Sequence, residues 1–157
     1  TKSNPSCVYC PMSVDCQANI ENRTGEFPGK KPKKPIPIRS TIFLQCLDSK
    51  NRVLLERRPP KGIWGGLWSF PEVTNKDEIA SWLLDKGLAL SDEPTEKPCQ
   101  SHTFSHFKLD ITPITCRVET ALLRIDDAER HRWFTLKAAL TLGLPAPVFK
   151  MLNTNTA

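Results

Sequence analysis

The sequence contains no run of about eighteen apolar residues, the length that an α-helix needs to cross a bilayer. Its first residues are polar and include cysteine, so they lack the apolar core of a secretory signal peptide. There is no internal repeat and no low-complexity stretch outside residues 17–37. We therefore expect a monomer that does not bind membranes, with one domain's worth of chain, since 157 residues suffice to bury a core.

A fourth clustered cysteine is also missing. Three thiols fall inside the stretch CVYCPMSVDC, namely Cys7, Cys10 and Cys16, whereas a zinc site or a cubane iron–sulfur cluster needs four ligands. The remaining cysteines are isolated in apolar, strand-like stretches, where buried free thiols are ordinary; they are Cys46, Cys99 and Cys116. This usage favours a reduced, intracellular protein with one metal-type site over a disulfide scaffold.

The net charge of +5 is unevenly distributed. Residues 1–40 hold seven basic and three acidic residues, so most of the basicity precedes the apolar part of the chain. The lysines gather in the stretch EFPGKKPKKPIP; they are Lys30, Lys31, Lys33 and Lys34. This stretch is either a contact for nucleic-acid phosphates or a solvated linker that its charges keep extended.

Proline and lysine density also predicts the domain organisation. Four prolines in twelve residues exclude a helix or a central strand, so we interpret residues 17–37 as an extended linker. Residues 1–16 form the cysteine segment before it, and residues 38–157 form the folded domain.

The domain's hydrophobic patterns predict strands and a few helices. We expect strands over residues 39–47 and 52–57 with a polar turn between them, then a Gly- and Trp-rich loop that leads into a short strand. A loop and a long strand cover 102–118, and a last strand covers 131–136. Short helices close the chain within 135–143 and 146–153. This order indicates a mixed α/β/α arrangement.

One internal helix is expected within residues 75–87. Asn75 is a suitable N-cap with Glu78 at the capping-box position, and Gly87 can end the helix. Its apolar face would contain Ile79, Trp82 and Leu83.

The stretch GGLWSFPEV resembles the start of the Nudix box, because Gly66 to Glu72 is G-x5-E and a helix follows. The resemblance implies a Nudix-like mixed-sheet α/β/α sandwich. In that family the box's carboxylates hold magnesium against a pyrophosphate. Here Ala80, Ser81 and Leu84 stand at three positions where the box has charged residues, which leaves Asp85 and Glu72 as a poor magnesium site. The sequence thus predicts the fold without its hydrolytic reaction.

The spacing C-x2-C-x5-C resembles the last three ligands of the [4Fe–4S] loop in helix-hairpin-helix DNA glycosylases. The fourth cysteine of that pattern would stand just before Thr1. We therefore expect this chain to be the C-terminal part of a longer protein, whose cluster is absent or incomplete here. A three-thiol zinc site and no metal at all are the alternatives.

Several stretches in order resemble the MutY-type adenine DNA glycosylases: CVYCPMSVDC, FPGKKPKK, RPPKGIWGGLWSFPE, HTFSHFKLDITP and LGLPAPV. The resemblance implies a bacterial, cytoplasmic, nucleoid-associated hydrolase of base excision repair that removes adenine opposite 8-oxoguanine in double-stranded DNA. It places the catalytic residues in an upstream domain, so we expect none within residues 1–157 and an inactive fragment. The family motif that reaches the lesion matches Phe104, Ser105 and His106.

The chemistry of this motif suits lesion reading. 8-Oxoguanine differs from guanine by a carbonyl at C8 and a proton on N7, and the Ser105 hydroxyl can both donate and accept. Phe104 can stack on bases and His106 can bond to a base edge. A strand entry with solvent-facing polar residues is the alternative. Two further hypotheses stay open: an active Nudix pyrophosphohydrolase, and a docking module whose linker binds a protein such as a sliding clamp.

Overall fold

The computed structural model describes residues 5–27, 29, 35–120 and 130–154. The chain divides into two compact units, residues 1–35 and 36–157, which we describe separately. Within the described residues, no helix is long and apolar enough to cross a membrane. The linker lysines Lys30, Lys31, Lys33 and Lys34 lie outside the described residues, so their role stays a prediction.

The N-terminal unit consists of short turns of helix. They are η1 (Cys7–Tyr9), α1 (Gln17–Ile20) and η2 (Thr24–Glu26). None of them contains a buried residue. Large apolar side chains of this unit, including Tyr9 and Val14, are exposed.

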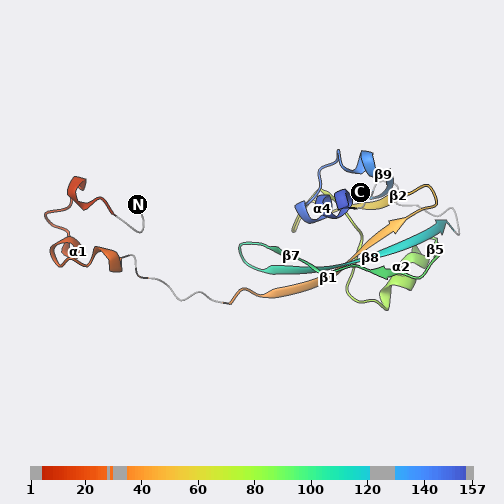
Figure 1. Ribbon diagram of the computed structural model, residues 1–157, viewed down its shortest axis with the longest axis horizontal. Coiled ribbons are helices and arrows are strands. Elements are labelled where there is room, and N and C mark those ends of the chain that lie inside the picture. Colours follow the sequence, from red (N-terminus) through yellow and green to blue (C-terminus); the bar gives the residue numbers. More distant parts are fainter. Residues whose placement is uncertain (1–4, 28, 30–34, 121–129, 155–157) are drawn as a thin grey trace. The chain divides into compact units, whose positions relative to one another are not determined.

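The C-terminal unit is a mixed sheet between helices (Figure 1). Its strands are β1 (Ile38–Leu47), β2 (Arg52–Arg57), β3 (Trp68–Ser69), β4 (Glu72–Val73), β5 (Leu88–Leu90), β6 (Thr95–Glu96), β7 (Gln100–Thr103), β8 (Lys108–Thr120) and β9 (His131–Thr135). Its helices are α2 (Glu78–Asp85), α3 (Leu136–Ala139) and α4 (Ala146–Thr154). The strands run in the order β3-β2-β1-β8-β5; β9 pairs with β2, β4 with β1, and β6 and β7 with β8.

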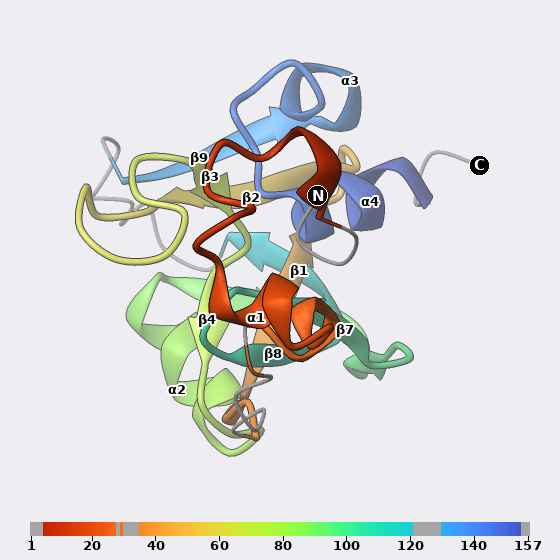
Figure 2. The ribbon, with the colours of Figure 1, turned by 90° about the vertical axis from the view of Figure 1, so that its left-hand side faces the viewer.

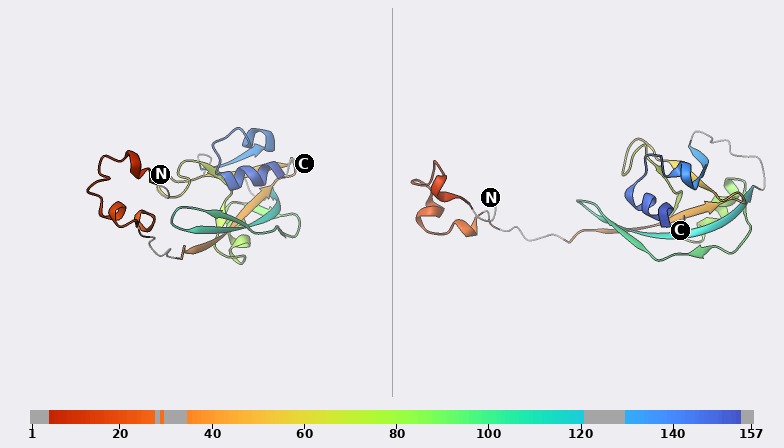
Figure 3. Two further views of the ribbon diagram at one scale, coloured as in Figure 1. Left: turned by 60° about the vertical axis from the view of Figure 1, so that its left-hand side comes forward. Right: turned by 45° about the horizontal axis from the view of Figure 1, so that its top comes forward.

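The parallel pair β1–β8 is the centre of the fold and has helices on both faces. Residues 42–46 of β1 are buried without a break, as expected of a strand covered on both sides. Successive side chains alternate between two clusters. Ile42 and Leu44 pack with α2, whereas Phe43 packs with α4. Figure 3 shows α4 lying over this face of the sheet. The expected α/β/α sandwich is confirmed.

Helix α2 begins later than expected, because it starts at Glu78 with Asp77 and not Asn75 as its N-cap, whereas it ends just before Gly87 as expected. The Asn75 side chain accepts a bond from the Glu78 N–H at 3.1 Å, and the Glu78 carboxylate accepts one from the Thr74 N–H at 2.9 Å. Gly87 has φ +66°, the left-handed conformation that ends many helices. The buried face contains Ile79 and Leu83.

Two expectations need correction. Residues 102 and 103 do not belong to a loop, because β7 extends to Thr103 and pairs with β8. Cys99 is exposed and not buried, whereas Cys46 and Cys116 are fully buried free thiols as expected and are opposite each other in the β1–β8 register. The contact with the Cys116 thiol and burial raise the pKa of Cys46 well above its ordinary range.

Candidate functional site

The β7–β8 hairpin presents the segment that the sequence singles out. Thr103 pairs with Lys108, and the Phe104 N–H donates to the Phe107 carbonyl at 2.8 Å, which closes a tight loop. Ser105 and His106 are the two residues inside this loop, and both are exposed. Their side chains contact each other, with 3.2 Å between the serine Oγ and the histidine Nδ1. We call residues 104–107 the hairpin tip.

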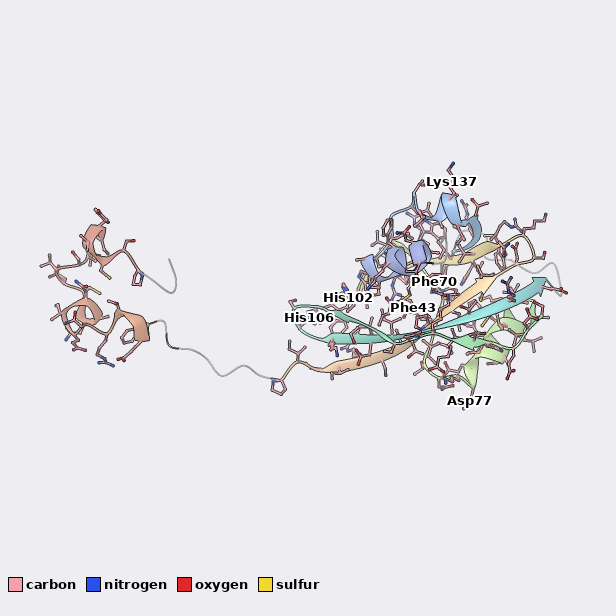
Figure 4. The ribbon with its side chains drawn as sticks, viewed as in Figure 1. Phe43, Phe70, Asp77, His102, His106 and Lys137 are labelled. Carbon is pink, nitrogen blue, oxygen red and sulfur yellow. The ribbon has the colours of Figure 1, made fainter. Side chains whose placement is uncertain are left out.

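Aromatic side chains hold the hairpin tip against the sheet. Phe107 is buried, and its ring stacks on Phe104 with 4.5 Å between centroids and 22° between planes. The Phe104 ring lies 5.3 Å from Trp64 and 4.7 Å from His102. Figure 4 shows His102 and His106 on this hairpin. Phe104 is half-buried, so its packing leaves Ser105 and His106 as the most accessible groups of the tip.

Trp64 comes from the loop between β2 and β3, which the fold brings against the hairpin. It also contacts Phe43 of the core, with 6.4 Å between ring centroids. Its φ is +57°, a conformation that non-glycine residues seldom adopt. Such backbone persists only where packing over-determines it, and here the ring packs against rings from two strands. The sequence left the role of Trp64 open; the structure makes it the support of the tip.

The two carboxylates that remain of the expected Nudix box, Glu72 and Asp85, each lie next to a cationic side chain. The Arg58 guanidinium forms an ion pair with Glu72, and both side chains are partly buried. Arg58 also lies 5.8 Å from the Trp64 ring centre. Asp85 is 75 % exposed and lies 3.5 Å from the Lys86 ammonium. Within the described residues, no three His, Cys, Asp or Glu side chains gather as a metal site would require.

Glu56 is the second carboxylate in this region and it too faces cations. Arg130 donates to it at 2.7 Å, and His131 Nε2 lies 3.6 Å away. Burial raises the pKa of Glu56, but hydrogen bonds to His131 and Arg130 outweigh burial and hold the pKa below its ordinary value. With Glu72 and Lys86, these residues line a cavity of about 390 Å³. A magnesium site needs uncommitted carboxylate oxygens converging on one point, which this cavity does not offer.

The cysteine segment supplies only part of a cluster's ligands. Cys10 is exposed, and Cys7 and Cys16 are half-buried. Three thiols are one short of the four that a [4Fe–4S] cluster needs, and the part of the chain that the structure describes brings no three candidate ligands together. The residues present therefore do not fit the cluster by themselves, and the assignment of Cys7, Cys10 and Cys16 as metal ligands stays a prediction.

Comparison with known proteins identifies the fold family. The profile of the NUDIX domain matches residues 42–154, most of the chain. The chain belongs to the NUDIX domain family. Among solved structures, this NUDIX domain is similar to the C-terminal domain of mouse MUTYH in its complex with human PCNA. The TM-score is 0.58 at 17% identity, with 74% of this chain and 88% of that chain covered.

Two curated relatives that match nearly the whole chain are both named adenine DNA glycosylase. This chain is 31% identical over 154 residues to the adenine DNA glycosylase of Buchnera aphidicola subsp. Acyrthosiphon pisum, and the match covers 95% of this chain and 42% of that protein. It is 32% identical over 153 residues to the adenine DNA glycosylase of Buchnera aphidicola subsp. Schizaphis graminum, covering 98% and 44%. The chain thus spans less than half the length of these relatives.

Sequence reasoning missed several residues of this region. The Arg39 guanidinium lies over the Phe107 ring at 4.8 Å, although Arg39 was expected only as a strand residue. The Arg58–Glu72 pair joins residues fourteen apart, and no local pattern signals it. Arg130 and Arg132 alternate around His131, a period-two pattern that could have indicated one charged strand face.

Proposed function

We propose that this chain is the lesion-recognition part of an adenine DNA glycosylase of base excision repair, which reads 8-oxoguanine opposite the adenine to be removed. The similarity to adenine DNA glycosylases over nearly the whole chain supports the DNA repair role. The observation that carries the reading role is the pair of exposed polar side chains, Ser105 and His106, on a tip that aromatic rings hold rigid.

Rigidity matters because, to distinguish 8-oxoguanine from guanine, the Ser105 hydroxyl must find a hydrogen-bond partner on the edge of 8-oxoguanine and lack one on the edge of guanine. A tip fixed by Phe107 and Phe104 holds Ser105 in place before DNA binds, so little ordering is needed at binding. A polar group left unmatched when it is buried against guanine costs roughly 1–3 kcal/mol. This corresponds to a preference of about 5- to 150-fold for 8-oxoguanine.

The excision of adenine is proposed to depend on residues outside this chain. The described residues bring no carboxylate to the hairpin tip, and the carboxylates Glu56 and Glu72 are both engaged by arginines. The same engagement argues against a metal-dependent pyrophosphohydrolase of oxidised nucleotides. A protein partner bound through the linker stays a prediction.

The test measures binding of the chain to duplexes that carry 8-oxoguanine or guanine opposite adenine, by fluorescence anisotropy. The variant Ser105→Ala is expected to lose most of the preference while keeping its affinity for the guanine duplex. Ser101→Ala is the matched control, because Ser101 is an exposed serine of the same hairpin that bonds to Asp110. An absent preference in the unmutated chain, or equal effects of the two substitutions, would refute the reading role.

A further inference from the structure

Strands β9, β2 and β3 lie side by side (Figure 2) and place several arginines on one face. Arg57 of β2 is opposite Trp68 of β3, and its N–H donates to the Arg130 carbonyl at 2.7 Å. Arg132 is opposite Leu55, two residues before Arg57. Side chains alternate along a strand and opposite residues share a face, so Arg57 and Arg132 belong to the same face. Arg130 comes just before β9, and its guanidinium reaches Glu56.

These residues line one open groove of about 740 Å³, which we call the arginine groove. Its charged residues are Arg57, Arg58, Arg130 and Arg132, and its other lining residues are Pro59, Pro60, Gly66 and Trp68. No carboxylate from the described part of the chain lines it. Arg57 and Arg132 are exposed. The groove therefore combines four guanidinium groups with an apolar indole.

Arg58 and Arg130 form ion pairs with carboxylates that lie outside the groove. Arg58 pairs with Glu72 and Arg130 with Glu56, and these carboxylates line the neighbouring cavity and not the groove. Guanidinium groups bind phosphate oxygens bidentately, which makes phosphate the best-matched anion.

The arginine groove is close to the hairpin tip. The Arg58 guanidinium carbon lies 5.8 Å from the Trp64 ring centre, and that ring lies 5.3 Å from Phe104. Arg58 and Phe104 are thus separated by at most about 11 Å, the rise of roughly three nucleotides along one DNA strand. A strand that is read at the tip and continues toward Arg58 would bring phosphates to the groove after about three nucleotides.

We propose that the arginine groove binds backbone phosphates of the same DNA whose lesion the hairpin tip reads. The proposal rests on the proposed function for the identity of the DNA, but it concerns affinity and not base identity. Phosphate contacts position a protein on DNA and carry no sequence information. A free nucleoside diphosphate offers the same oxygens. The open groove, without an enclosed pocket for the base, favours the continuous strand.

The experiment titrates the chain with labelled duplex DNA at several salt concentrations. Each phosphate contact contributes about 0.9 to the slope of log K against log salt. The double variant Arg57→Gln/Arg132→Gln is expected to reduce this slope by about two and to weaken both the 8-oxoguanine and the guanine duplex equally. It leaves the Arg58 and Arg130 ion pairs intact, and a thermal melt of each variant shows whether it stays folded. Arg117→Gln is the control, because Arg117 is an exposed strand arginine 3.9 Å from Asp92.

An unchanged slope in the double variant, or the same loss in Arg117→Gln, would overturn the proposal. Calorimetry with ADP in the absence of DNA distinguishes the other source of phosphate. ADP binding that the double variant abolishes, with the DNA slope unchanged, would assign the groove to free nucleotides instead. The two proposals fail separately: Ser105→Ala tests the preference between duplexes, whereas Arg57→Gln/Arg132→Gln tests the salt slope.

Discussion

Gly65 is the position where a single methyl group should disturb the hairpin tip from a distance. A Cβ added there would lie 2.3 Å from the Pro60 carbonyl oxygen and 2.9 Å from its carbon. Carbon–oxygen contacts are normally no shorter than about 3.3 Å, so the loop segments that contain Pro60 and Gly65 must move apart by about 1 Å. The Pro60 atoms are backbone and the added Cβ is fixed to the backbone of residue 65, so no side-chain rotation can relieve the contact.

The movement would reach the tip through Trp64, the residue before Gly65. Trp64 packs on Phe104 and His102, and its own backbone is already in the left-handed region. Overpacking of this kind costs about 1–3 kcal/mol, and a backbone clash belongs near the upper end. We expect Gly65→Ala to lower Tm by roughly 5–15 °C and to reduce the preference for the 8-oxoguanine duplex.

The assay combines a thermal melt with the two-duplex binding measurement. Gly143→Ala is the control, because a Cβ at Gly143 meets only the flexible Leu67 Cδ2 at 3.2 Å, which can move by a few tenths of an ångström. Its Tm and duplex preference should stay close to those of the unmutated chain. The reasoning is refuted if Gly65→Ala melts like Gly143→Ala, or if it loses stability while the duplex preference stays complete.

Three further outcomes follow from local contacts. Asn75→Ala should cost about 1 kcal/mol in a thermal melt because it removes the hydrogen bond that the Asn75 side chain accepts from the Glu78 N–H at the start of α2, whereas Asp77→Ala should not, since the Asp77 side chain makes no cap bond. Because its folded pKa is lowered, Glu56 stabilises the fold above about pH 4.5, its ordinary value, and this contribution disappears as pH falls through the folded value. Acid unfolding should therefore be shallower for Glu56→Gln, and equal slopes would contradict this. A colorimetric thiol reagent should modify the exposed cysteines first and reach Cys46 and Cys116 only on unfolding.

The central strand β1 was predictable because its consecutive apolar residues indicate a strand that is buried on both faces. The run from Ile42 to Cys46 is apolar except for Gln45, and a strand covered on both faces needs such a run. The start of α2 was predictable because Asn75 and Glu78 act within one helical turn. Local chemistry of this kind does not depend on the rest of the fold.

Strand β7 shows why other elements were missed. Its residues, Gln100 to Thr103, are polar and have no strong strand preference. They form a strand because β8 offers a long edge with unpaired backbone groups, and those groups must find partners. The burial of Cys46 against Cys116 depends in the same way on the β1–β8 register, which joins residues seventy apart.

For the candidate site, the sequence indicated which residues are exposed but not what supports them. Ser105 and His106 occupy the loop of the hairpin as expected, whereas the packing of Phe104 under Trp64 required the tertiary fold. The arginine groove was missed for the same reason. Arg57 and Arg132 come from different strands, and only the β2–β9 pairing places them on one face.

Arg58 connects these features. Its guanidinium neutralises Glu72, the glutamate that a Nudix box would use to bind magnesium, and the same group lies over Trp64. A metal at Glu72 would have to displace this cation, and displacement would remove the contact that holds the loop carrying Trp64. Magnesium binding and a fixed hairpin tip therefore compete for one carboxylate. The geometry favours the tip, because a partly buried ion pair that loses one partner leaves the other charge partly shielded from water and uncompensated.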